Sequence, residues 1–134
     1  MHPNYCKAHQ WSSKVIGAAI EVHRLKGAGL LESIYQKCLA RELSLREIPA
    51  VSQLVVPIEY KGFVFDEPLR LDLYIDQCLI IEAKAVEQIL PIHKAQLLSY
   101  MKLLDAPLGL LINFHEILLK NGIKRLILEG ADKV

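Results

Sequence analysis

An almost wholly apolar run from Cys78 to Val86 constrains the fold more than any other feature of the sequence. Its length predicts a strand, and a strand that is apolar on both faces lies inside a sheet that is covered on both sides. The run carries two charges, Glu82 and Lys84, which project from the same face of a strand because they are two positions apart. We therefore expect a central sheet with an acid and a base inside it.

The preceding segment, Leu69 to Ile75, alternates apolar and polar residues. This period of two predicts a strand with one apolar face and with Asp72 on its polar face. A two-residue turn at Asp76-Gln77 would direct Asp72 away from Glu82, whereas a three-residue turn from Asp76 to Cys78 places the two acids opposite each other. Since Asp76-Gln77 is not one of the strong two-residue turn pairs, we predict the three-residue turn.

The remaining elements follow from the spacing of apolar residues. Helical spacing predicts three helices, which run from Ser12 or Ser13 to the break at Lys26–Gly29, from about Leu30 to Arg46, and from Pro91 to about Leu104. Further strands are predicted at Leu54–Tyr60, where Pro57 indicates an edge strand or a bulge, at Leu108–Phe114 and at Ile123–Leu128. The order αα-βββ-α-ββ predicts an α/β fold in which a mixed central sheet is flanked by helices.

The composition sets the limits within which function is sought. A chain of 134 residues fits one domain, 1–134, in which we expect residues 1–12 to be poorly ordered or loosely packed. The net charge of +1 argues neither for nor against nucleic acid. No apolar run is long enough for a membrane span, and the three cysteines lack the spacing of a zinc site. These features favour a cytoplasmic protein with no membrane partner.

Two acids beside one lysine are the residue types that metal-assisted phosphodiester hydrolysis uses. The metal ion needs carboxylate oxygens, and a lysine can orient the attacking water or stabilise the phosphate. Glu82 and Lys84 alone would also suit a structural ion pair. With Asp72 present, however, the excess negative charge would be satisfied by a cation, so we favour the metal interpretation. The small Ala83 leaves room for its carbonyl to reach the same ion.

Residues on two helices could extend this site. Glu32 lies in the first turn of the second helix, on the flank of its buried stripe, although an acid there also suits the helix dipole. His93, Gln96 and Tyr100 are spaced three and four apart and line one face of the third helix, which could instead be a solvated face. We expect both helices to direct these side chains toward the sheet.

The segment Gly29-Leu30-Leu31-Glu32-Ser33-Ile34-Tyr35 matches the naming motif of the bacterial GxxExxY protein family, which is placed among the PD-(D/E)xK nuclease-like proteins. The chain resembles this family from about Val15 to Leu128. The resemblance implies a restriction-endonuclease-like core and Mg²⁺ or Mn²⁺ as cofactor, without implying a substrate. Leu71 stands where the superfamily name has proline, and Ala83 replaces a bulkier residue.

The resemblance also implies roles for individual residues. Glu32 corresponds to the superfamily's acid on the first core helix, Asp72 to its metal-binding aspartate, and Glu82 and Lys84 to its Glu-x-Lys pair. The segment from Gln96 to Tyr100 resembles the Gln-x-x-x-Tyr feature of some DNA-repair nucleases.

Our leading hypothesis is a metal-dependent nuclease that acts on DNA or RNA, with DNA favoured over RNA as the partner, and that forms a homodimer. Its metal ligands would be Asp72, Glu82 and the Ala83 carbonyl, Lys84 would activate water, and Glu32 and Gln96 would complete the catalytic site. Its substrate-binding residues would be Tyr35, His93 and Tyr100. The alternative is a non-catalytic binding or assembly module, in which the acidic cluster is a relic. A small-molecule binding protein is disfavoured, because the sequence contains no phosphate loop or cofactor fingerprint.

Overall fold

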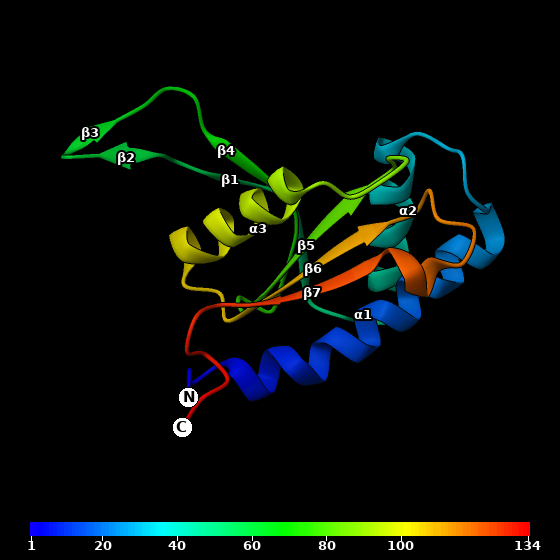
Figure 1. Cartoon of the computed structure of the whole chain (residues 1–134), viewed down its shortest axis with the longest axis horizontal. Helices are drawn as coiled ribbons and strands as arrows, with labels where there is room; N and C mark the ends of the chain where they lie inside the picture. The colour runs from blue at the N-terminus through cyan, green and yellow to red at the C-terminus, as the bar shows by residue number, and fades with distance from the viewer.

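The computed structural model describes residues 1–134 and has a five-stranded mixed sheet at its centre (Figure 1). The strands stand in the order β1-β4-β5-β6-β7, and their bounds are β1 Ala50–Val56, β4 Leu69–Ile75, β5 Leu79–Lys84, β6 Leu108–Asn113 and β7 Ile123–Ile127. Strands β5 and β6 are parallel, and the other neighbours are antiparallel. Strand β5 is central and is buried from Leu79 to Ala83, as its apolar run predicts. The predicted α/β fold class is confirmed.

Helices cover both faces of this sheet and create two cores. Helices α1 (Tyr5–Lys26) and α2 (Glu32–Leu45) lie on one face, and α3 (Pro91–Leu104) lies on the other (Figure 1). The larger core contains α1 and α2 side chains such as Val15 and Leu39 with β5 residues such as Ile81. The smaller core joins Leu97 and Met101 of α3 to the opposite face of the sheet. None of the helices is both long and apolar enough to cross a membrane.

The turn between β4 and β5 has the predicted length of three residues. Ile75 pairs with Leu79, so Asp76 to Cys78 lie between the strands. Asp76 and Gln77 both have positive φ, 45° and 56°, a left-handed conformation that residues other than glycine rarely adopt. The indole of Trp11 donates a hydrogen bond to Asp76 Oδ2 over 2.9 Å and holds the turn against α1.

The expectation of a single apolar face along β4 is wrong in its detail. Leu73 and Ile75 belong to the larger core, whereas Leu69 and Leu71 pack with α3 in the smaller one. The switch from one core to the other occurs at Asp72. Opposite Asp72, Gln53 of β1 has a φ of 56°, and the β1–β4 ladder has no pair between Ser52–Leu73 and Leu54–Leu71. A left-handed residue in an edge strand gives a strong local twist, which carries the first half of β4 toward α3.

The N-terminal segment also differs from the expectation. Helix α1 begins at Tyr5 rather than at Ser12 or Ser13, so residues 1–12 are neither loose nor mostly irregular. Ala8 and Ser12 are buried because their small side chains allow the helix to approach the sheet closely. The His2 N–H donates to the Ala131 carbonyl over 2.9 Å, and this bond fastens the N-terminus to the C-terminal segment.

The predicted strand Leu54–Tyr60 is divided in two. Strand β1 ends at Val56, and Pro57 follows it because proline cannot donate to a continuing ladder. The chain then forms a separate hairpin of β2 (Glu59–Tyr60) and β3 (Phe63–Val64), which projects from the β1–β4 side of the sheet (Figure 1). A 3₁₀ turn, η1 (Leu119–Gly122), directly precedes β7.

Candidate metal centre

Asp72 and Glu82 come together where β4 and β5 separate. The ladder between β4 and β5 ends at the pair of Leu73 with Ile81, and the same register places Asp72 opposite Glu82. The Ala83 N–H donates a hydrogen bond to Asp72 Oδ2 over 2.9 Å instead of to a backbone carbonyl. Because paired residues share a face, both acids lie on the α3 side of the sheet with Ile80. The predicted register therefore brings the two acids together.

The Glu82 carboxyl is buried without enough partners. Only 5% of the residue is exposed, and its Oε1 atom has no hydrogen-bond partner. Burial raises the pKa of Glu82 to about 9, and the charge of Asp72 and a side-chain hydrogen bond to Asp72 contribute in the same direction, while the charge of Lys84 opposes them. A protonated Glu82 is thus the stable form of the metal-free chain at neutral pH.

Backbone geometry adds a third oxygen to this pair. The Lys84 carbonyl faces β6, where it accepts a hydrogen bond from the Phe114 N–H over 2.8 Å. The backbone carbonyls of successive strand residues point alternately to the two neighbouring strands. The Ala83 carbonyl therefore points toward β4, on which Asp72 lies. No three His, Cys, Asp or Glu side chains converge anywhere in the structure. Two carboxylates and one carbonyl nevertheless suit Mg²⁺ or Mn²⁺, which keep several water ligands, and the unpartnered Oε1 is the atom that such an ion would satisfy.

Helix α3 contributes two side chains to this site: Gln96, which contacts Lys84, and the phenol of Tyr100. The Lys84 ammonium donates to Gln96 Oε1 over 3.4 Å. One turn further along α3, Tyr100 is half-buried, and its pKa is raised by burial and then by the charges of Glu82 and Asp72. Gln96 itself is exposed, so it can meet a ligand from solvent. The structure therefore brings Lys84, Gln96 and Tyr100 to the two acids.

The interpretation of Tyr35 as a substrate-binding residue is wrong. Its side chain is completely buried and stacks on the Phe114 ring with the centroids 4.7 Å apart. Its hydroxyl donates to the Gly27 carbonyl over 2.6 Å and accepts from the Leu30 N–H over 3.0 Å. Tyr35 thus closes the glycine-containing loop that joins α1 to α2. The helical stripe alone could not distinguish a buried phenol with backbone partners from an exposed one.

His93 has a local contact that sequence analysis missed. Its Nδ1 atom accepts a hydrogen bond from the Leu90 N–H over 2.9 Å at the start of α3. This bond satisfies a backbone donor near the helix terminus, where intrahelical partners are missing. The contact gives His93 a role in fixing the start of the helix that carries Gln96.

Glu32 does not join Asp72 and Glu82 in a three-acid group, and a chain of amides connects it to the sheet instead. Gln36 donates to Glu32 Oε2 over 3.3 Å, and Gln53 donates to Gln36 Oε1 over 3.0 Å. Gln53 is the left-handed residue opposite Asp72. The one-turn spacing of Glu32 and Gln36 could have indicated the first contact, but nothing in the sequence reveals the backbone of Gln53.

Asn113 is a second residue that sequence analysis missed. It is completely buried at the end of β6, where its Oδ1 accepts from the Val86 N–H over 3.1 Å and its Nδ2 donates to the Val86 carbonyl over 2.8 Å. This pair of bonds fixes the chain just beyond Lys84. A buried amide with both ends satisfied is a structural support of the site.

A mixed sheet with an aspartate and a Glu-x-Lys pair on adjacent strands defines a nuclease-type fold. The sequence profile described as PD-(D/E)XK nuclease superfamily matches residues 9–126, and the chain belongs to this superfamily. The crystal structure of SSO0001 has a TM-score of 0.51 and 22% sequence identity with this chain, covering 91% of this chain. That likeness shows a common fold, and this chain spans 61% of the length of that structure. A comparison with curated proteins gave no match.

Proposed function

We propose that this protein is a metal-dependent nuclease of the GxxExxY type, which hydrolyses phosphodiester bonds of nucleic acid. The observation that carries the proposal is the buried, unpartnered Glu82 Oε1 next to Asp72, with Lys84 on the same strand. A carboxylate in this position is costly for a metal-free protein and useful for one that binds a cation.

Asp72, Glu82 and the Ala83 carbonyl would hold Mg²⁺ or Mn²⁺. The bound ion would lower the pKa of a water ligand and neutralise charge on the phosphate. Lys84, whose ammonium contacts Gln96, orients the attacking water and stabilises the developing negative charge. Tyr100 and Gln96 present polar groups at the open side of the centre, where a phosphate would enter. Glu32 acts through Gln36 and Gln53 as a positioning residue.

We further propose that the substrate, DNA or RNA, is held through its phosphate backbone. A basic residue on the Glu82 face supports a nucleic-acid ligand, because Glu82 pairs with Leu111 and Leu111 pairs with Lys124. Paired residues share a face, so the exposed Lys124 lies on the same side of the sheet as Glu82. Phosphate contacts of this type give affinity without sequence preference.

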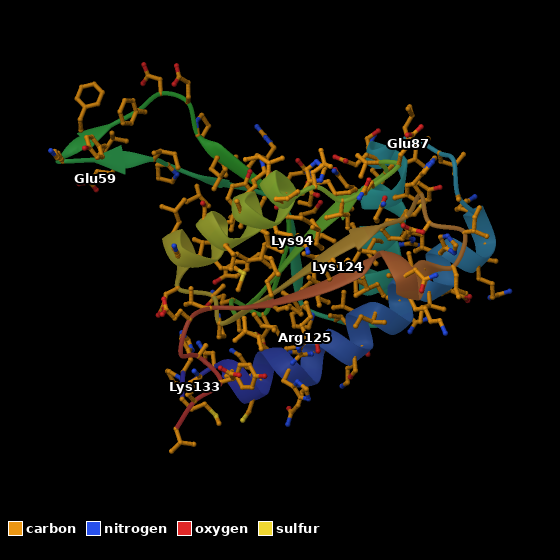
Figure 2. The ribbon with its side chains drawn as sticks, viewed as in Figure 1. Glu59, Glu87, Lys94, Lys124, Arg125 and Lys133 are labelled. Atoms are coloured by element: carbon orange, nitrogen blue, oxygen red, sulfur yellow. The ribbon has the colours of Figure 1, made fainter.

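The test is metal-dependent cleavage of single-stranded and double-stranded DNA and RNA by the wild-type chain and by Glu82→Gln. Glu87→Gln is the matched control, because Glu87 is an exposed acid in the loop after β5 (Figure 2). We expect Glu82→Gln to lose at least about 100-fold in rate, as removal of one main stabilising group does, and Glu87→Gln to keep the rate. Cleavage by neither wild type nor control, together with binding of nucleic acid, would favour the non-catalytic module instead.

A further inference from the structure

The hairpin formed by β2 and β3, with the residues that flank it from Pro57 to Pro68, is called here the aromatic arm. Glu59 pairs with Val64 and Tyr60 pairs with Phe63, and the Phe65 N–H extends the pairing to the Ile58 carbonyl over 2.9 Å. Alternation along the two strands therefore places Ile58, Tyr60, Phe63 and Phe65 on one face. Glu59 and Val64 lie on the other face. The arm is thus amphipathic, with aromatic side chains concentrated on one side.

Most of the aromatic face is uncovered within the chain, although the Lys61 ammonium lies over the Tyr60 ring, 5.3 Å from its centre. Tyr60, Phe63 and Phe65 are 62%, 65% and 39% exposed. The Phe63 and Phe65 rings contact each other edge to face with centroids 5.2 Å apart, and the arm extends away from the rest of the molecule (Figure 1). A two-stranded hairpin is marginally stable in water by itself, and clustered exposed aromatics mark an interaction site.

The charge of the arm limits the kind of partner. From Pro57 to Pro68 the arm carries the acids Glu59, Asp66 and Glu67 and one base, Lys61. This excess of negative charge repels a phosphate backbone, although aromatic rings could otherwise stack on bases. A protein surface that is apolar and basic is the better match.

The outer face of α3 has these properties. Ile92, Ala95, Ser99 and Leu103 recur at helical spacing on its exposed side, and Ile92 and Leu103 are 68% and 52% exposed. The helix contains no acid, and of its two lysines Lys102 lies on this face, three positions from Ser99 and seven from Ala95, whereas Lys94 shares the stripe of Leu97 and Met101. Neither lysine, nor any acid of the arm, forms an ion pair within the chain.

We propose that the aromatic arm is a dimerisation element, and that in a two-fold dimer the arm of each copy lies on the outer face of α3 of the other. A two-fold axis makes the two contacts identical, so each copy has its arm and its helix face covered at once. Two arms and two helix faces would bury on the order of 1,000 Å², estimated from aromatic side chains of roughly 150–250 Å² each that are about half exposed in the single chain, which reaches the lower size limit of a specific interface. Because α3 also carries Gln96 and Tyr100, the partner's arm borders the candidate metal centre. The proposal does not depend on catalysis.

The test measures the mass of the full-length chain by sedimentation over a range of concentrations. We expect a dimer for wild type and at least about a 100-fold rise in its dissociation constant for the double variant Tyr60→Ser with Phe63→Ser. The control Val64→Ser changes an exposed residue on the opposite face of the arm and should leave the dimer unchanged. Far-ultraviolet circular dichroism checks that each variant is folded, which we expect because the arm pairs with no other strand.

Charge reversal tests the choice of surface. Lys102→Glu should weaken the dimer, and adding Glu67→Lys to the same chain should restore it. A wild type that is monomeric at every concentration would overturn the proposal, as would a dimer that survives the loss of Tyr60 and Phe63. A monomeric wild type whose arm variant loses oligonucleotide binding would assign the arm to nucleic acid instead.

Discussion

Magnesium binding should depend strongly on pH, because the ion has to displace a proton from Glu82. Burial and the neighbouring Asp72 raise the pKa of Glu82 to about 9. At pH 7 roughly 1% of the metal-free molecules carry an ionised Glu82, since the pH is about two units below the pKa. The apparent affinity for Mg²⁺ should therefore rise about tenfold from pH 7 to pH 8 and level off above pH 9.

Titration calorimetry in buffers of different ionisation enthalpy measures both parts of this prediction. The affinity gives the pH dependence, and the dependence of the heat on the buffer gives the number of protons released, which we expect to be about one at pH 7. Glu87→Gln should behave as wild type. Glu82→Gln should bind weakly with no proton release, because its amide has no proton to lose in this range. An affinity for Mg²⁺ that is equal at pH 7 and pH 8, with no proton release, would refute the idea that Glu82 is protonated and then becomes a ligand.

Three further predictions concern the metal-free fold. The free energy of unfolding should fall as pH rises from about 5 to 9, because the folded chain keeps the Glu82 proton that the unfolded chain has lost. Chemical denaturation should show this free energy falling by up to about 1.4 kcal/mol per pH unit, and Glu82→Gln should remove this dependence. Tyr35→Phe should cost roughly 1–3 kcal/mol by thermal denaturation, since it leaves the Gly27 carbonyl and Leu30 N–H without their buried partner. Gln53→Gly keeps the left-handed backbone but removes the contact with Gln36, whereas Gln53→Ala also strains the backbone. The Ala83 N–H donates to Asp72, so its hydrogen exchange should become faster in both variants, and more so in Gln53→Ala, while the Phe114 amide stays protected. Equal protection of the Ala83 amide in wild type and both variants would show that Gln53 does not position Asp72.

The local pattern of the sequence determined the order of the elements and the register at the centre of the sheet. The apolar run around Glu82 required a covered central strand, and the poor turn propensity of Asp76-Gln77 favoured the three-residue turn that places Asp72 opposite Glu82. Helix α3 was predicted from Pro91 to Leu104 because proline fits the first turn of a helix and the apolar stripe has a clear helical period. These features depend on neighbours in the chain, so the sequence alone was sufficient.

Only the tertiary structure decided which polar side chains reach the centre and which ones support it. Tyr35 and Tyr100 look alike as polar residues on the flank of a helical stripe, yet one is completely buried against Phe114 and the other is half-buried beside two acids. The left-handed Gln53 donates a hydrogen bond to Gln36, seventeen positions away in the chain. Burial, strain and long-range hydrogen bonds arise when distant segments meet, and a periodic pattern within one segment contains no information about them.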